Sequence, residues 1–396
     1  MRVAGNGQEA IEVPPAAARY GPLVISGRER PIATWAEDTV SVAISVLGVA
    51  GMYWDSWRHN TKVIEDDNFW SPPHIALYTS LLVLLLWIGL IVIRRQESRG
   101  LDLSAIPRGY GVGIVGLVMA GAGGVGDFIW HAKFGFEDQV NAWWSPPHQV
   151  LFYGGVLVAT APLISSWHRK GGRLGVRDAA PVVLSLAVVT ATATYALTHL
   201  SPLWNNVAPS DAFQDDIARL NDAYPPGELP PGHVGIDAAV RTFGDDSFPY
   251  YFYSLNQSVA ALLLFAITLA TPVLLLVRRW RPPFGAVTVM FALFGLVTAI
   301  PTEFRDIEFV AGLVAAGLLV DAVIAWLRPE LPDRPWQFRA IGASVPLLSV
   351  STYLITFELS KGLAWTISIW LGILITCTMI GLGLACLMAP PRTADE

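Results

Sequence analysis

Long runs of apolar residues, separated by short polar segments, make up most of this chain. A helix that crosses the hydrocarbon core of a bilayer needs about 20 predominantly apolar residues. The runs approach that length and are continuous rather than alternating in polarity, which favours helices over the strands of a membrane barrel. The pattern therefore predicts an all-α, polytopic integral membrane protein, with spans at residues 36–57, 74–93, 110–131, 147–167, 179–199, 250–277, 284–302, 307–327, 339–359 and 363–388.

The polar segments divide the chain into predicted regions. A polar tail at 1–33 precedes two pairs of helices at 34–167, and six further helices follow at 168–388, with a short tail at 389–396. The longest connection, 200–248, is acidic and rich in Pro and Gly. A connection of this length is typical of a functional lid or of a partly disordered segment. No apolar h-region begins the chain, so we expect no cleavable signal peptide.

The composition agrees with a membrane protein and argues against nucleic-acid binding and against sites built from cysteine. Of the 396 residues, 53% are hydrophobic and 15% are charged, whereas about 25% charged residues are usual in soluble proteins. The net charge of −6 comes with no basic stripe, which excludes nucleic acid as a partner. Both cysteines, Cys377 and Cys386, lie in the last apolar run, so neither a disulfide framework nor a thiolate metal site is expected.

Charged residues are distributed unequally between alternate connections. Lys and Arg gather in the N-terminal tail and in every second connection after it. By the positive-inside rule, this predicts a multi-pass protein of the inner (cytoplasmic) membrane with both termini in the cytoplasm. Acidic residues gather on the opposite, outer side, and so does every histidine except His168, namely His59, His74, His131, His148, His199 and His233. We therefore expect the chemistry of this protein at its outer face.

Two segments of the chain resemble each other closely. Residues 51–78 align with residues 124–153, and both contain the pentapeptide Trp-Ser-Pro-Pro-His, at 70–74 and at 144–148. Each copy runs from the end of one predicted span, through a short outer loop, into the start of the next. The alignment predicts an internal, parallel repeat of two helical hairpins, formed by the first four spans.

The aligned segments share residues that can bind a metal. In each copy an Asp and a His are four residues apart, which places them one turn apart on the same helix face. The second His, in the pentapeptide, follows two prolines that suit the first turn of a helix. Two imidazoles and one carboxylate form a ligand set used for non-haem iron, and imidazole also suits copper and zinc. The predicted ligands are Asp55, His59, His74, Asp127, His131 and His148, with Glu65, Glu137 and His199 as supporting residues.

Other interpretations of the same residues stay open at this point. The two copies can form one shared site or two equivalent sites. A purely structural role, in which these side chains pair at helix ends, explains each residue singly. It explains the pattern shared by both copies less well, because ionisable groups near a membrane are expensive and usually functional. Asp321 within the eighth predicted span fits a proton relay or a bond to a neighbouring helix.

The Asp-x3-His pattern followed by a second His, at Asp55, His59 and His74 and again at Asp127, His131 and His148, resembles a known metal site. It looks like the metal-binding helices of the C subunit of the membrane-bound copper monooxygenases, which act on methane or ammonia. The resemblance covers only the two aligned segments. It implies copper as the metal, whereas the ligand set alone also allows iron or zinc. As an enzyme, the protein would be a metal-dependent oxidoreductase that binds O₂ or a small apolar substrate. A metal or proton transporter and a membrane haem-binding protein are the alternative functions.

Overall fold

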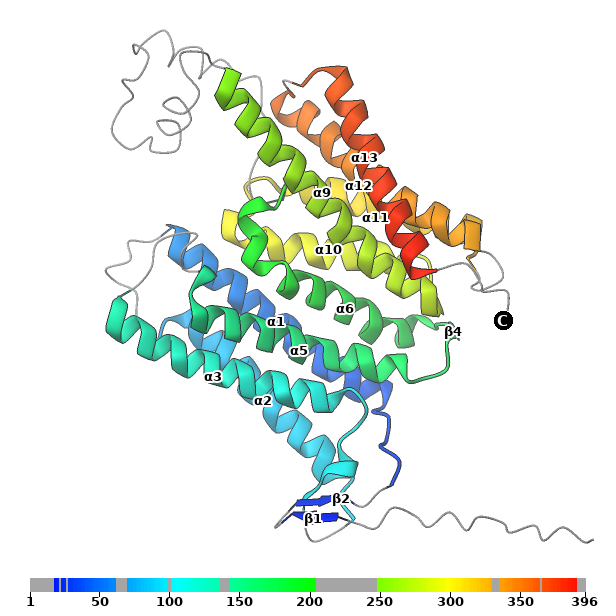
Figure 1. Cartoon of the computed structure of the whole chain (residues 1–396). Helices are drawn as coiled ribbons and strands as arrows, with labels where there is room; N and C mark the ends of the chain where they lie inside the picture. Colours follow the sequence, from blue (N-terminus) through cyan, green and yellow to red (C-terminus); the bar gives the residue numbers. More distant parts are fainter. Residues whose placement is uncertain are drawn as a thin grey trace, which may run out of the picture.

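The computed structural model describes residues 18–20, 23–25, 28–61, 70–97, 101–135, 143–203, 248–329, 335–363 and 365–389. At 18–20, 23–25, 59–61, 199 and 248–255 it describes the backbone alone. The α-helices in these ranges are α1 (Trp35–Thr61), α2 (Pro72–Ile93), α3 (Tyr110–Phe134), α5 (Pro146–Trp167), α6 (Val176–Ala193), α9 (Phe248–Arg279), α10 (Ala286–Thr298), α11 (Ile307–Leu327), α12 (Pro335–Lys361) and α13 (Ile367–Met388) (Figure 1).

The helices confirm an all-α, polytopic membrane protein. Each one lies where the apolar pattern predicts a span, and 8 of them are long and apolar enough to cross a membrane. Many apolar side chains have no protein neighbour to cover them, including Leu82, Leu85 and Leu86 on α2. Exposed apolar surface on this scale requires lipid around the helices. The protein is therefore a multi-pass protein of a lipid bilayer.

Two predicted spans are shorter than the sequence indicates. The segment 284–302 forms α10, of 13 residues, followed by a 3-10 turn η4 (Ile300–Thr302). At 1.5 Å per residue, α10 is about 20 Å long, less than the thickness of the hydrocarbon core. Pro301 has no N–H to continue the helical bonding, which explains why the helix ends there. The segment 179–199 likewise ends as an α-helix at Ala193 and continues as a 3-10 helix η3 (Tyr195–Leu200).

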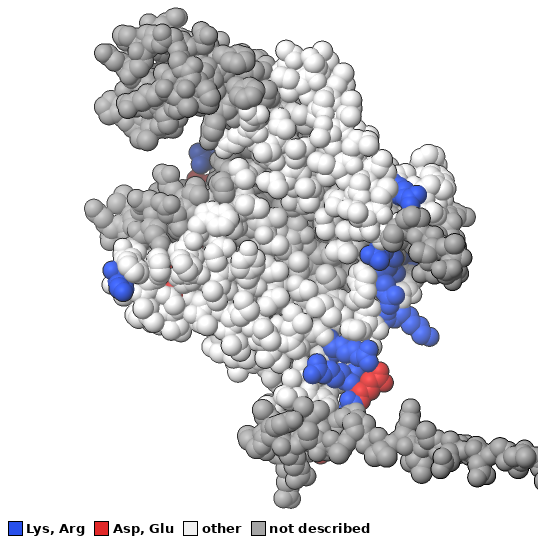
Figure 2. Space-filling model, in the orientation of Figure 1, with Lys and Arg blue, Asp and Glu red and all other residues white. Residues whose placement is uncertain are grey.

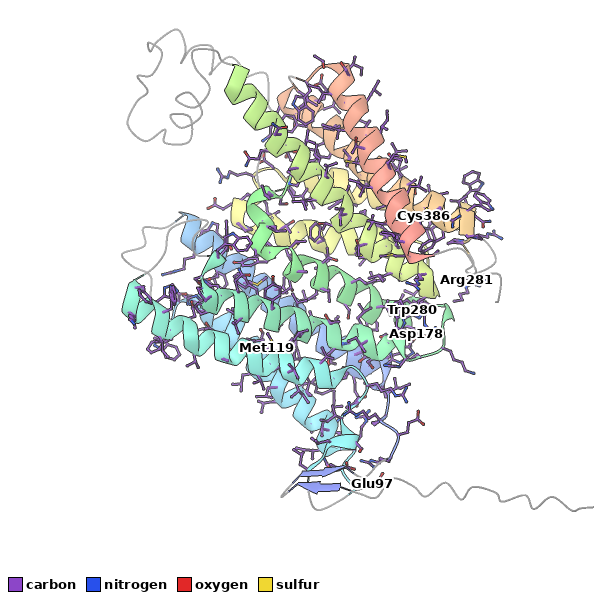
Figure 3. All side chains as sticks on the ribbon, in the orientation of Figure 1. Glu97, Met119, Asp178, Trp280, Arg281 and Cys386 are labelled. Atoms are coloured by element: carbon purple, nitrogen blue, oxygen red, sulfur yellow. The ribbon has the colours of Figure 1, made fainter. Side chains whose placement is uncertain are left out.

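Short strands tie the loops together at one end of the bundle. Within the predicted polar tail, β1 (Ala18–Tyr20) pairs with β2 (Leu23–Ile25), which also pairs with β3 (Leu101–Asp102). The connection from α5 to α6 carries β4 (Gly172–Arg173), which pairs with β5 (Trp280–Arg281) after α9. Figure 3 labels Trp280 and Arg281 at this end of the bundle. The Trp280 ring packs edge-on against Trp167, with centroids 5.1 Å apart.

The first helices pack as two hairpins, α1 with α2 and α3 with α5. Among the described helices, α3 and α5 make the most extensive contact, because glycines let the two backbones approach closely. A Cβ atom at Gly116 would lie 2.6 Å from the carbonyl oxygen of Gly154. Helix α1 also packs on α5 and α6, and α2 contacts α3, so the hairpins lie against each other. Helices α6 and α10 join them to α9, α11, α12 and α13 (Figure 1).

Buried charges hold together the end of the bundle where α1 begins. Asp38 is fully buried, and its carboxylate lies 2.5 Å from Nη2 of Arg169 and accepts a hydrogen bond from the Tyr110 hydroxyl at 2.8 Å. Arg169 also stacks on the Trp35 ring, with its Cζ 3.8 Å from the ring centroid. Beside this pair, Glu37 contacts Arg95 through two bonds of 2.6 and 2.9 Å. Figure 2 shows Lys and Arg side chains gathered on this side of the molecule, where Figure 1 places β4.

Candidate metal centre

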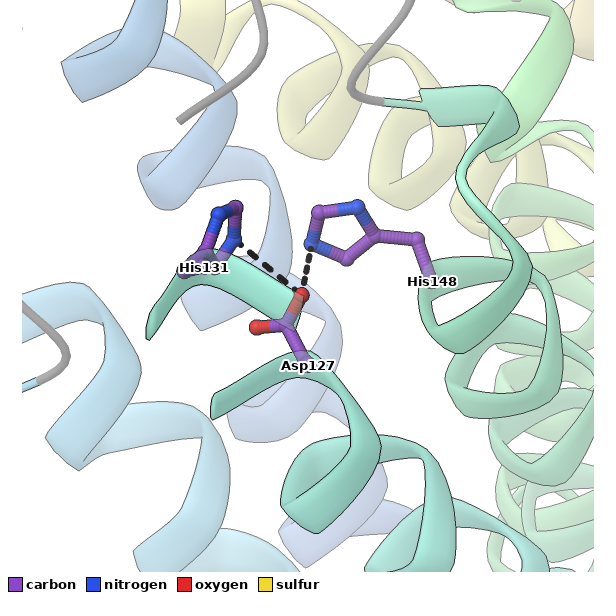
Figure 4. A group of neighbouring side chains, drawn as sticks. All are labelled: Asp127, His131 and His148. Carbon is purple, nitrogen blue, oxygen red and sulfur yellow. Dashed lines mark ion pairs between the residues drawn. The ribbon is translucent and has the colours of Figure 1, made fainter. Parts of the chain in front are cut away.

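Three predicted metal ligands meet where α3 ends and α5 begins, at the other end of this hairpin from the buried Asp38–Arg169 pair. Asp127 and His131 lie one turn apart near the end of α3, and His148 lies in the first turn of α5. Each can offer one ligand atom such that all three atoms lie within 4.8 Å of one another. Figure 4 shows both imidazole rings turned toward the Asp127 carboxylate. The carboxylate itself is only 1% exposed, so this is a buried polar site.

The two imidazoles converge on one oxygen of the carboxylate. Nε2 of His131 lies 3.1 Å and Nε2 of His148 lies 3.0 Å from Oδ1 of Asp127. The ring centroids are 5.7 Å apart. The second oxygen, Oδ2 of Asp127, is buried and has no hydrogen-bond partner among the described residues. A buried carboxylate oxygen without a hydrogen bond is costly, and a bound cation would remove that cost.

The position of the proton on His131 follows from its other nitrogen. Nδ1 of His131 lies 3.1 Å from the carbonyl oxygen of Gly135, which can only accept a hydrogen bond. Nδ1 therefore carries the proton, and Nε2 of the neutral ring presents a lone pair to Asp127. In that state, Nε2 of His131 and Oδ1 of Asp127 are both acceptors 3.1 Å apart, and such a pair is stable only with a proton or a metal cation between them. Metal-binding histidines almost always donate their other N–H in this way, to a carbonyl or carboxylate.

Gly135 can make this contact because it ends α3 in a conformation open to glycine. Its φ is 79° and its ψ is −175°, a region that residues with a Cβ atom essentially never occupy. The Gly135 N–H bonds back to the His131 carbonyl at 3.0 Å. The end of α3 thus fixes both the backbone and the ring of His131.

The pentapeptide at 144–148 positions the second imidazole. Ser145 is the N-cap of α5, and Pro146 and Pro147 occupy the next two positions. Prolines have no N–H, so the donor at the second helical position, one of the two that an N-cap hydroxyl usually satisfies, is missing. The Ser145 hydroxyl instead lies 2.8 Å from Nδ1 of His148. On its other side, the His148 ring stacks on Phe152, with the planes 6° apart.

The first hairpin places two of its predicted ligands in the same way. Nε2 of His74 lies 3.3 Å from Oδ1 of Asp55, as His148 lies against Asp127, and His74 is buried. His59 lies in α1 and His199 in η3, but their side chains are outside the described part of the structure. Glu65 and Glu137 lie outside the described residues altogether. The repeat and the ligand role of the first copy therefore stay predictions.

Sequence reasoning missed an aromatic side chain beside each pentapeptide histidine. Tyr78 follows His74 by four residues, and Phe152 follows His148 by four, so each lies one helical turn away. The centroids of the Tyr78 and His74 rings are 6.0 Å apart. The shared spacing in the aligned segments was the signal that could have revealed these residues.

Asp321 has a structural role in the described part of the protein. Its carboxylate accepts hydrogen bonds from the backbone N–H groups of Val287 and Thr288, at 3.1 and 2.9 Å, and from the Thr288 hydroxyl at 2.7 Å. These groups lie in the first turn of α10, so Asp321 caps that helix from α11. Of the two interpretations that the sequence allows, the bond to a neighbouring helix is the one observed.

No protein-family model matches the chain, and no curated protein or solved structure matches it either. The site offers two imidazole nitrogens and a buried carboxylate at one end of the α3–α5 hairpin, with each ring held through its other nitrogen. This arrangement can hold a metal ion and leave further coordination positions open.

Proposed function

We propose that the protein is a membrane metalloprotein whose metal ion is held by Asp127, His131 and His148. The main support is that two imidazole Nε2 atoms converge on one buried carboxylate, while Nδ1 of His131 donates its proton to the Gly135 carbonyl. A structural ion pair needs only one imidazolium for one carboxylate. A second ring at 3.0 Å, and an Asp127 oxygen without a hydrogen bond in the described region, fit a cation better.

Copper is the favoured metal. Nitrogen and oxygen ligands bind divalent copper more tightly than iron or zinc, by the Irving–Williams order. The ligand pattern also resembles that of the membrane-bound copper monooxygenases. Iron and zinc accept the same two-histidine, one-carboxylate set and are the alternatives that metal analysis separates from copper.

Open coordination positions at such a metal would support an oxidoreductase function of the monooxygenase type. When bound, the metal would supply redox chemistry toward O₂ or a small apolar substrate. The chain's own part is to orient the ligands. The Gly135 carbonyl and the Ser145 hydroxyl each hold one imidazole through Nδ1, and Phe152 covers the His148 ring and helps exclude water.

The alternative functions have less support. A transporter needs a polar path through the bundle, but Asp321 is engaged in capping α10. A haem iron clamped by two histidines needs them on opposite faces of a large planar ring, whereas His131 and His148 converge on one carboxylate oxygen. A Soret absorption band in the purified protein would identify haem.

We also propose that the site faces the outer side of the inner membrane. The α5–α6 connection, at the other end of α5 from His148, carries Arg169, Lys170 and Arg173. Basic connections are cytoplasmic by the positive-inside rule, which places the Asp/His site and the termini on opposite sides.

Metal analysis of the purified protein tests the proposal. The detergent-purified wild type is compared with His131→Ala/His148→Ala, and with His168→Ala as a matched control at the opposite end of α5. We expect the double variant to lose one equivalent of metal per chain, while His168→Ala retains the wild-type content. Equal metal content in all three proteins would refute the proposal.

A further inference from the structure

An apolar cavity lies between the two hairpins, directly beneath the Asp/His pairs. It has a volume of about 50 Å³, and its walls come from α1, α2, α3, α5 and α6. Met52 lies three residues before Asp55 in α1, and Leu77 lies three residues after His74 in α2. Since the two helices run in opposite directions, Met52 and Leu77 both lie on the same, deeper side of the Asp55–His74 pair. Each is about one helical turn, or about 5 Å along the axis, from its polar neighbour.

The same relationship holds in the second hairpin. Leu151 and Phe152 follow His148 by three and four residues in α5, and both line the cavity. Phe152 also stacks on the His148 imidazole, with centroids 5.7 Å apart. The cavity wall thus includes the side chain that packs on a proposed metal ligand.

Hydroxyl groups on the wall are already engaged within their own helices. The hydroxyl of Ser45 donates to the Ser41 carbonyl at 2.9 Å, that of Ser80 to Leu77 at 2.7 Å, and that of Thr192 to Val188 at 2.8 Å. None of these protons is directed to a guest in the cavity. A water molecule needs two to four polar partners to be held in a protein interior. The wall therefore suits an uncharged, apolar guest better than water.

Small residues keep the space open. Ala120, Gly155 and Ala159 line it where larger side chains would enter. A Cβ atom at Gly155 would lie 3.3 Å from Cγ2 of Thr192, so added bulk there is directed at the opposing wall. Apolar cavities of modest size bind apolar guests such as xenon.

We propose that this cavity binds a small apolar molecule, of the size of dioxygen, beside the metal centre. Its role as a substrate site rests on the proposed metal function, whereas the binding itself depends only on the cavity. The occupant would lie against the Phe152 side of His148 and beneath both Asp/His pairs. A small apolar molecule bound in the cavity would then be the substrate of the proposed metal centre.

Xenon tests the binding in the metal-free protein. The methionine methyl groups are labelled with ¹³C, and the chelator-treated protein in nanodiscs is titrated with xenon pressure. Met52 lines the cavity, Met290 is buried on α10, and Met379 is exposed on α13. We expect a saturable shift of the Met52 signal only. A Met52 response that rises linearly with pressure, like that of Met379, would mean partition into lipid and would overturn the proposal.

Two glycine variants make the test specific. Gly155→Val fills the cavity and should abolish the saturable Met52 shift, while an unchanged Met290 signal reports an intact fold. Gly121→Val adds the same volume on α3 where no atom lies within 4 Å of the new Cβ, and it should keep the shift. Saturation that survives Gly155→Val would place xenon elsewhere and contradict the proposal. Because metal content is measured separately, either proposal can fail without the other.

Discussion

His131 donates from Nδ1 to the carbonyl oxygen of Gly135, four residues further along the chain, at 3.1 Å. This bond is local, yet it determines which nitrogen of the ring faces Asp127. In the neutral ring it leaves the lone pair on Nε2, and it makes the end of α3 part of the proposed metal centre. A residue that never contacts the metal is thereby expected to influence metal affinity.

Gly135→Ala should weaken metal binding. A Cβ atom is incompatible with a φ of 79° and a ψ of −175°, so the end of α3 must rearrange and release the His131 ring. Loss of such an orienting contact typically lowers metal affinity by about 10- to 100-fold. Competition titration with a chelating dye measures the change. Gly121→Ala, in the regular part of α3, is the control and should leave affinity unaltered; equal affinities for the two variants would exclude the role given to Gly135.

Ser145→Ala should loosen His148. The variant removes the hydroxyl that lies 2.8 Å from Nδ1, and we expect about a tenfold loss of affinity from the same orienting effect. The equivalent residue of the first copy, Ser71, is a matched control because its buried hydroxyl has no hydrogen-bond partner among the described residues. Ser71→Ala should have little effect. A larger loss for Ser71→Ala than for Ser145→Ala would assign the tight site to the first hairpin.

Arg169→Ala should destabilise the fold. The variant leaves the carboxylate of Asp38 buried without its charge partner, and breaking a buried pair in this way costs about 3–5 kcal/mol. The control is Arg108→Ala, whose partner Glu29 is 84% exposed, so that its loss should cost no more than about 1 kcal/mol. Denaturant unfolding in mixed micelles measures both. Similar unfolding free energies for the two variants would contradict the structural role of Asp38.

Much of the fold was predictable from the apolar pattern, because a bilayer imposes a minimum length on each span. One exception has a local cause and another a long-range one. Pro301 ends the helical bonding after α10, which shortens a span that looks apolar to residue 302. The pairing of β2 with β3 depends on two segments far apart in the chain.

The candidate site was predictable only in part. The spacing of Asp127, His131 and His148 indicated a common site, and the structure brings their ligand atoms together. The acceptor for His131 is a backbone carbonyl, and because every residue has one, the sequence does not indicate which carbonyl is used. The approach of Tyr78 to Gly124, where a Cβ atom would lie 2.8 Å from Cε1 of the tyrosine, depends on how α2 and α3 are rotated. Helix rotation is decided by packing across the whole bundle.

In the proposed metal centre, both imidazoles bind one metal ion through Nε2. Pulsed electron paramagnetic resonance on protein loaded with one equivalent of Cu²⁺ tests it most directly, because the remote nitrogen of each bound imidazole gives its own modulation. We expect two bound imidazoles in the wild type, one in His131→Ala and one in His148→Ala, with two retained in His168→Ala. The same number of imidazoles in all four proteins, or none, would contradict it.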